Sequence, residues 1–183
     1  MLPPSAIEAC KDSPLLAAFL SVIGDALDPA SGLPSRPRLD VVRLGRLGVM
    51  PFLWIMERGD DGLFRFRLTG EETERTWGRN PRGRTLAEIL ERAQADLLEA
   101  DLFAALDSRT MRLQSGEVRR GGLHYYTVRR LLVPMCGKDG ALRFVIACFE
   151  RLDVDPAAVL EAGITFVIDR VEVFPLGPGD PAA

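Results

Sequence analysis

Four residues have side chains suited to holding a small ligand: Trp77, Asn80, Tyr126 and Arg130. We expect Trp77 to end a short helix facing a sheet, and Tyr126 and Arg130, four residues apart in one strand, to share a face. A buried guanidinium keeps its charge, so Arg130 needs an acceptor from the protein or from a ligand. These residues predict a site for a small anionic or carbonyl-bearing molecule. The alternative is that Trp77 and Tyr126 fill the core while Arg130 extends to solvent.

The sequence lacks the residues that most catalytic sites require. His124 is the only histidine, which excludes Ser-His-Asp and Cys-His catalysis and multi-histidine metal sites. The carboxylate pairs Asp60-Asp61 and Glu71-Glu72 lie beside a turn and a helix start, where carboxylates cap and are solvated. No glycine-rich phosphate loop stands between a strand and a helix. We predict no metal site and no enzymatic activity.

The composition is that of an ordinary globular chain. Its 183 residues suffice for one domain, with 47% hydrophobic and 27% charged residues. The net charge of −3 argues against nucleic-acid binding, which needs a concentrated basic face. No run approaches the roughly 18 apolar residues of a membrane span, and the first residues do not resemble a secretion signal. The three cysteines do not have the spacing of metal ligands, and an odd number cannot all pair as disulfides. Both facts favour a protein located in the reducing cytosol. We predict a cytoplasmic protein that binds neither membranes nor nucleic acid.

An amphipathic helix is predicted near the N-terminus. Ser13-Pro14 forms a good helix start, because Ser13 can cap and Pro14 needs no partner for an N–H. The apolar stripe that follows requires cover, either from the rest of the chain or from a second subunit. We predict a homodimer through this helix, and a linker over residues 29–37. The stripe consists of Leu15, Leu16, Phe19, Leu20, Ile23 and Leu27.

Five strands are predicted, over residues 50–57, 63–69, 116–121, 125–134 and 141–150. The first and last are apolar on both alternating faces, so they should be neighbours in the middle of the sheet. The third is polar and predicts an edge strand. Glycine-rich turns at 59–62 and 137–140 predict hairpins. A short helix over 155–161, a sixth strand over 164–174 and a disordered tail from Pro175 complete the chain.

The predicted helices lie mainly between the second and third strands. A short helix over 71–77 ends at Gly78, and Thr85 with Glu88 fits a capping box. A long helix over 91–108 should expose Asp96, Glu99 and Asp101 to water. Before the first strand, a helix over 40–46 should turn Val41, Leu44 and Leu47 inward. The predicted buried stripe of the long helix is Leu97, Leu98, Leu102, Ala105 and Leu106.

The predicted elements run in the order two strands, several helices and three strands, which is an α+β order. Five short segments accompany it: Leu33-Pro34-Ser35-Arg36 before Asp40, Phe64-Arg65-Phe66-Arg67-Leu68-Thr69-Gly70, Trp77-Gly78-Arg79-Asn80, Gly83-Arg84-Thr85-Leu86, and Tyr126 followed by Leu131-Leu132-Val133-Pro134. In this order and these segments the chain resembles the PAS family, in particular a bacterial subgroup of stand-alone PAS-like proteins.

The resemblance spans about residues 33–149 and implies a five-stranded antiparallel sheet in the order 2-1-5-4-3, with helices on one face and an added N-terminal helix. It divides the chain into an N-terminal helix and linker (1–32), a PAS-like domain (33–151) and a C-terminal extension (152–183).

The resemblance implies no fixed cofactor, because PAS domains hold haem, flavin, metabolites or nothing. Pro81 stands where the photoreactive cysteine of flavin-binding members would be, so that photochemistry is excluded. His124 precedes a strand rather than lying on the long helix, which argues against haem. The resemblance predicts a non-enzymatic sensory or regulatory module that binds a small molecule or a partner signalling protein. Two alternatives stay open: a structural dimerisation module with a filled core, and an enzyme with an unrecognised site.

Overall fold

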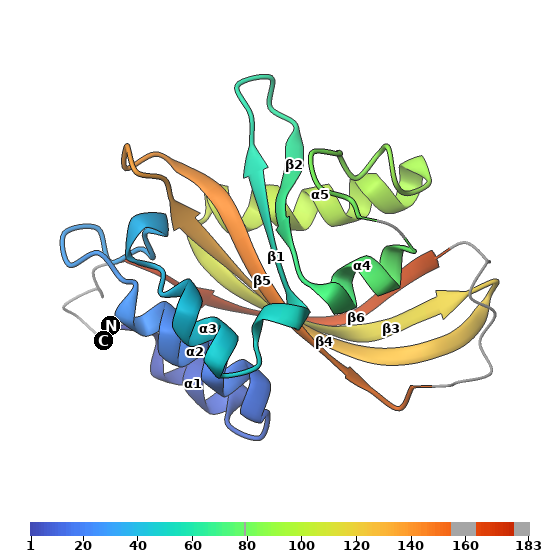
Figure 1. The fold of residues 1–183 in the computed structure, drawn as a ribbon, viewed down its shortest axis with the longest axis horizontal. Coiled ribbons are helices and arrows are strands. Elements are labelled where there is room, and N and C mark those ends of the chain that lie inside the picture. Colours follow the sequence, from blue (N-terminus) through green and yellow to red (C-terminus); the bar gives the residue numbers. More distant parts are fainter. Residues whose placement is uncertain (79, 155–163, 178–183) are drawn as a thin grey trace.

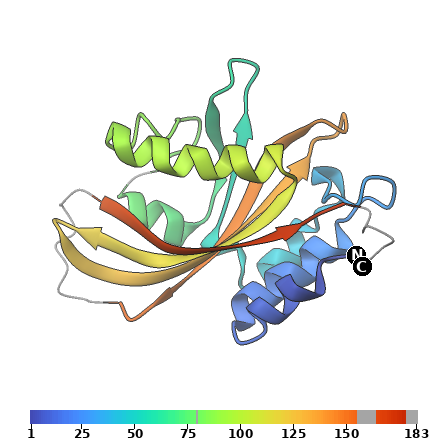
Figure 2. The same cartoon turned by 180° about the vertical axis from the view of Figure 1, so that it is seen from behind.

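One antiparallel sheet runs through the molecule, and helices lie on both of its faces (Figures 1 and 2). The computed structural model describes residues 1–78, 80–154 and 164–177. The predicted order 2-1-5-4-3 is confirmed, and the sixth strand joins it beside the third, which gives β2-β1-β5-β4-β3-β6. The strands are β1 (Leu53–Arg58), β2 (Phe64–Thr69), β3 (Thr110–Arg120), β4 (Leu123–Cys136), β5 (Leu142–Leu152) and β6 (Ile164–Pro175).

The two strands that are apolar on both faces pair in the middle of the sheet, as predicted. β1 and β5 are antiparallel, with Ile55 opposite Ile146 and Trp54 opposite Ala147. All four side chains are buried, Ile55 and Ile146 on one face and Trp54 and Ala147 on the other. β1 begins three residues later than predicted, because residues 50–52 form the 3₁₀ helix η2 (Met50–Phe52).

The prediction that the third strand is a polar edge is wrong. β3 begins at Thr110, six residues earlier than expected, and pairs with β4 on one side and β6 on the other. Polar side chains in the first half of β3 therefore point into the protein: Gln114 is buried, and the side chain of Arg112 is only 16% exposed. β6 takes the edge position instead.

The sheet face beside the N-terminus is covered by the chain's own helices, α1 (Pro4–Cys10), α2 (Pro14–Asp25) and α3 (Val41–Arg46). α1 was not predicted. In α2 the residues Leu16, Phe19 and Ile23 are fully buried in one core with sheet residues such as Leu131 and Ile146. This intramolecular cover removes the reason for expecting a dimer through α2. Whether the protein is a homodimer stays a prediction.

The opposite face is covered by α4 (Glu71–Trp77) and α5 (Arg92–Asp107), which form a second core with the sheet. Two predictions about α5 are wrong: Leu97 is 44% exposed, whereas the side chain of Asp101 is only 13% exposed and pairs with Arg112. Thr85 and Glu88 do contact each other, since Thr85 N donates to Glu88 Oε2 at 2.7 Å. They close a turn, however, and the helix begins only at Arg92.

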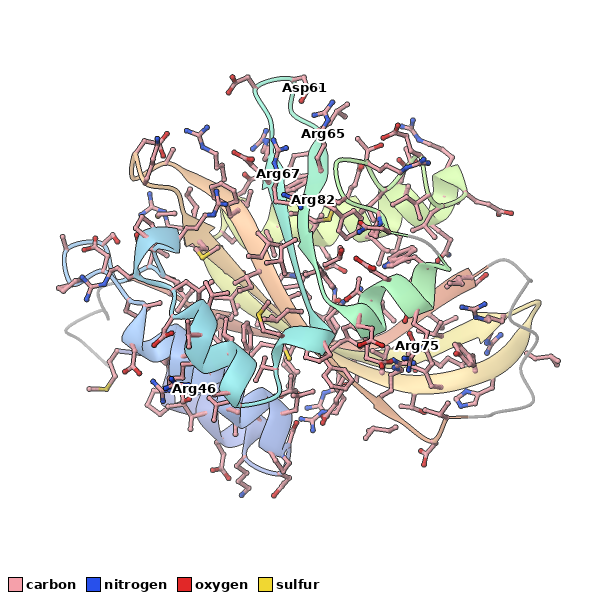
Figure 3. The ribbon with its side chains drawn as sticks, in the orientation of Figure 1. Arg46, Asp61, Arg65, Arg67, Arg75 and Arg82 are labelled. Atoms are coloured by element: carbon pink, nitrogen blue, oxygen red, sulfur yellow. The ribbon has the colours of Figure 1, made fainter. Side chains whose placement is uncertain are left out.

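Other local predictions have mixed outcomes. Both glycine-rich turns form hairpins, and at the first of them Asp61 pairs with Arg65 at 2.7 Å (Figure 3). Of the three α3 residues predicted to face inward, only Leu44 is buried, while Val41 and Leu47 are about half exposed. The predicted helix over 155–161 and the tail from residue 178 lie outside the described residues. The tail's first residues are ordered, because Leu176 N donates to Arg109 O at 2.8 Å and the Leu176 side chain is buried.

A polar network fastens the N-terminal helices to the sheet. Ser13 caps α2 by accepting a hydrogen bond from Leu16 N at 3.1 Å, and its hydroxyl donates to Glu150 Oε2 at 2.6 Å. Arg129 donates to Glu150 Oε1 at 3.1 Å and to the carbonyl of Ala9 at 2.8 Å. The buried Ser13 side chain therefore forms hydrogen bonds both with the start of α2 and with Glu150 of the sheet.

We predict that Ser13→Ala lowers the free energy of unfolding by about 1–3 kcal/mol, since it removes a helix cap and a charge-assisted hydrogen bond. Chemical denaturation monitored by circular dichroism measures the change. Ser5→Ala, an exposed position in α1, is the matched control and should change stability by less than about 0.5 kcal/mol. Equal effects of the two substitutions would show that the Ser13 network does not contribute.

Candidate functional site

The predicted ligand residues Trp77, Tyr126 and Arg130 meet between the sheet and α4. They line a small hollow whose other walls come from α4 and from the strands β1, β4, β5 and β6. The space left for solvent is about 20 Å³, enough for about one water molecule. A second hollow of the same size continues toward α5 and shares Trp77 and Arg130. The remaining walls of the first hollow are Trp54, Thr73, Thr76, Val128, Phe149 and Phe166.

Trp77 closes the hollow from the helix side. α4 ends there because Gly78 takes a left-handed conformation, with φ of +68°, that favours glycine. The indole lies against Phe66 and Phe166, with ring centroids 6.1 and 5.4 Å away. Thr73 ties the helix to the sheet by donating from Oγ1 to Leu53 O at 3.1 Å.

Tyr126 forms the floor. Its side chain is fully buried, and its hydroxyl lies 3.2 Å from Thr76 Oγ1. Burial raises the pKa of Tyr126 to about 12, so the phenol is neutral at physiological pH. A neutral phenol can donate or accept a hydrogen bond in the hollow.

Arg130 brings a positive charge to the wall without a carboxylate in contact. Its Nε donates to Gln114 Oε1 at 2.8 Å, and its Nη2 contacts the same oxygen. The guanidinium carbon lies 6.0 Å from the Trp54 ring centroid and 5.8 Å from that of Phe166. Burial lowers the pKa of Arg130 to about 10, which still leaves it charged at neutral pH.

The nearest carboxylate belongs to Asp101 and is already shared. Gln114 donates through Nε2 to Asp101, and Arg112 donates to the same carboxylate at 2.8 Å. Within the part of the chain that the structure describes, no acidic side chain contacts Arg130. The cluster of Arg112, Arg130 and Asp101 therefore has a net charge of +1, with the amide of Gln114 between Arg130 and the carboxylate.

Asn80 does not join the other three residues. It is exposed, and its Oδ1 accepts a hydrogen bond from Arg82 N at 2.9 Å, which closes a turn. Gln114 and Asp101 were not predicted as site residues. Gln114 lies opposite Arg130 in the β3–β4 register, but the predicted strand began only at residue 116. Asp101 reaches Gln114 from α5, through the packing of that helix on the sheet.

The described residues, 1–78, 80–154 and 164–177, include three cysteines whose side chains are buried. No group of three or more His, Cys, Asp or Glu side chains is placed to hold a metal ion within these ranges. The cysteines Cys10, Cys136 and Cys148 are free and buried, and burial raises their thiol pKa values, that of Cys10 to about 11. Across residues 1–78, 80–154 and 164–177, no helix is both long and apolar enough to span a membrane.

Comparisons with known proteins give matches only among solved structures. No family model matches the chain, and no curated protein matches it. A sensory box sensor histidine kinase from Vibrio cholerae matches 61% of this chain and 87% of its own, with 17% identity and a TM-score of 0.41. The PAS domain of a protein from Colwellia psychrerythraea matches 62% of this chain and 98% of its own, with 11% identity and a TM-score of 0.41. The PAS-like strand order rests on the observed pairing of the strands rather than on these two structures.

The burial of Tyr126 predicts a loss of stability in alkali. The folded-state pKa lies above the value of about 10 for a free phenol, so folding retains a proton that the unfolded chain releases. The stabilisation is complete below about pH 10 and is lost as pH rises toward about 12. Unfolding free energies measured between about pH 9 and 12 should fall less steeply in Tyr126→Phe than in the wild type.

Tyr125→Phe is the comparison for this experiment, because it keeps the Tyr126 phenol and removes only the smaller contribution of Tyr125 to its raised pKa. Its slope should lie between those of Tyr126→Phe and the wild type. Identical slopes in Tyr126→Phe and the wild type would contradict the prediction.

Proposed function

We propose that the protein is a non-enzymatic, PAS-like sensory module that binds a small anionic or carbonyl-bearing molecule beside Arg130. The observation that supports this most directly is the guanidinium of Arg130, which is half-buried in the wall of the hollow and has the neutral Gln114 as its hydrogen-bond partner. A charge so placed is stabilised by an anion, because desolvation has removed the water that would otherwise compensate it.

Binding requires the hollow to open. Its space of about 20 Å³ is far below the roughly 300 Å³ of a small-molecule site. Trp77 is the wall that can move, because it is the last residue of a seven-residue helix and is only half-buried. A ligand that displaces Trp77 moves α4 with it, which supplies a conformational signal for a partner protein or a second copy of the chain.

The alternative function is a structural interaction module whose core is filled. The small volume of the hollow favours it, since Trp77, Phe166 and Tyr126 already occupy the space between sheet and helices. The two functions make opposite predictions for added ligands, so one experiment separates them.

The test uses thermal denaturation with a panel of small mono- and dicarboxylates and keto acids. A compound present at about a hundredfold its Kd should stabilise the wild type by about 2.7 kcal/mol, or roughly 5–10 °C in Tm. Arg130→Met should lose this shift. Trp54 and Trp77 are the only tryptophans and both line the hollow, so the same compound should also change the intrinsic fluorescence.

Arg119→Met is the matched control, because Arg119 lies in the neighbouring strand and pairs with Glu117. It should keep the full shift. Native mass spectrometry of freshly purified protein then reports bound small molecules and oligomeric state together. A mass equal to that of the bare chain, together with no stabilising compound, would favour the filled-core module.

A further inference from the structure

A second and larger hollow lies on the opposite face of the sheet, away from Arg130. It consists of two adjoining cavities of about 380 and 270 Å³, which both include Arg36 in their walls. Together they run along β1 and β5: Glu57 and Phe144 line the first cavity, and Ile55 and Ile146 line the second. These residues alternate along the two strands and so share one face. We call the two cavities together the outer groove.

The inner part of the outer groove is apolar. Leu53, Ile55 and Ile146 form its floor on the sheet, and Leu44 of α3 forms one wall. Val41, which the sequence led us to place in the core, lies instead at the rim and is 48% exposed. A cavity of this size with an apolar floor is large enough to receive a small hydrocarbon chain.

Basic side chains from three separate segments converge on the rim. Arg36 belongs to the 3₁₀ helix η1 (Arg36–Arg38), and its guanidinium lies 5.0 Å from the centroid of the Phe144 ring. Arg67 belongs to β2, and Arg82 lies beside the β1–β2 hairpin (Figure 3). The loop is held there because Gly83 N donates to the carbonyl of Phe66 in β2 at 2.8 Å.

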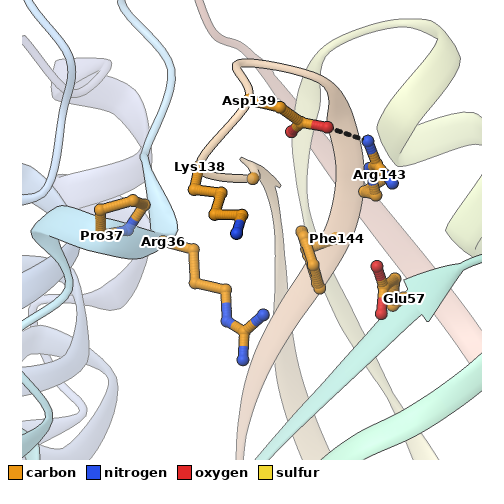
Figure 4. A pocket seen from close by; sticks show the side chains of 8 residues that line it. Arg36, Pro37, Glu57, Lys138, Asp139, Arg143 and Phe144 are labelled. Atoms are coloured by element: carbon orange, nitrogen blue, oxygen red, sulfur yellow. Dashed lines mark hydrogen bonds and ion pairs between the residues drawn. The ribbon is translucent and has the colours of Figure 1, made fainter.

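The first cavity adds further positive charge. Figure 4 shows the side chains of Arg36 and Lys138 directed into it, facing Phe144 and Glu57. Asp139 pairs with Arg143, and Glu57 pairs with Arg67 at 2.6 Å. Within the described ranges, no carboxylate contacts Arg36, Arg82 or Lys138.

The outer groove therefore concentrates charge of the sign opposite to that of the whole protein. It is lined by five basic side chains and two carboxylates, a net charge of +3, whereas the chain carries −3. A concave wall of one sign focuses the field on ligands of the opposite sign. The charge lies at the rim and the first cavity, and the apolar surface lies deeper in the second.

We propose that the outer groove binds a free amphiphilic anion, namely a medium-chain acyl carboxylate. The hydrocarbon chain packs in the second cavity against Leu39, Met50 and Leu68, which are only partly buried, and the carboxylate is held by Arg36 and Arg82. A small inorganic anion would leave the apolar floor exposed, and a neutral lipid would leave the basic rim without a partner. Only a molecule with both parts matches the whole groove.

The test measures octanoate binding by isothermal titration calorimetry at neutral pH. Octanoate should bind the wild type, while 1-octanol, which lacks the charge, and acetate, which lacks the chain, should bind at least about tenfold more weakly. Arg36→Met combined with Arg82→Met should weaken octanoate binding by about tenfold, and Arg46→Met, an exposed arginine of α3 outside the groove, should not change it.

A second pair of variants tests the apolar part without changing charge. Val41→Trp places a large ring at the rim and should abolish octanoate binding. Val42→Trp is its matched control, because Val42 is 65% exposed and lines neither cavity, and it should bind octanoate as the wild type does. Near-native thermal stability of both variants shows that they are folded.

Other outcomes would overturn the proposal. If Arg130→Met loses octanoate binding and Val41→Trp keeps it, the ligand occupies the hollow beside α4 instead. If the protein sediments with vesicles containing phosphatidylglycerol but gives no heat with octanoate, the groove recognises a membrane surface rather than a free carboxylate. Equal binding of octanoate and octanol would exclude a role for the basic rim.

Discussion

The arrangement of the whole molecule depends on the antiparallel pairing of β1 with β5. Both strands carry apolar side chains on both faces, so a sheet with these two strands at its centre cannot present either face to water. The N-terminal helices cover one face, and α4 with α5 cover the other. Each face of the sheet is therefore covered within the same chain. The apolar stripe of α2 is used for this cover and is not free to bind a second subunit.

Successive side chains of a strand point to opposite faces of the sheet, so neighbouring residues meet different partners. Arg129 and Arg130 are adjacent in β4 but lie on opposite faces. Arg129 meets the carboxylate of Glu150 and the end of α1, so its charge is compensated and its role is to hold the helices in place. Arg130 meets Gln114, and the carboxylate behind Gln114 is shared with Arg112. Two identical side chains thus have different roles, because only one of them has an anion within reach.

The two faces of the sheet also differ in the volume that their covering helices leave for a ligand. The hollow beside α4 is filled by Trp77 and by rings from β1, β5 and β6, so binding there has to displace a side chain. The outer groove already holds about 270 Å³ of space in its second cavity, although Ile55 and Ile146 of its floor are themselves buried. β1 contributes to both: Trp54 lines the first, and Leu53 and Ile55 line the second. A ligand on either face therefore contacts the same central strand.

Local patterns in the sequence determined the helix cap at Ser13, the two glycine-rich hairpins and the two-sided burial of β1 and β5, because each depends on residues close together in the chain. The strand order followed from the same patterns together with the PAS resemblance. Which strand lies at the edge did not follow: β6 pairs with β3 only in the folded chain, and that pairing places Gln114 inside. The partner of Arg130, the burial of Asp101 and the convergence of Arg36, Arg67 and Arg82 join segments far apart in sequence. Tertiary structure alone decided them, because the distance between two charges depends on register and packing rather than on their spacing along the chain.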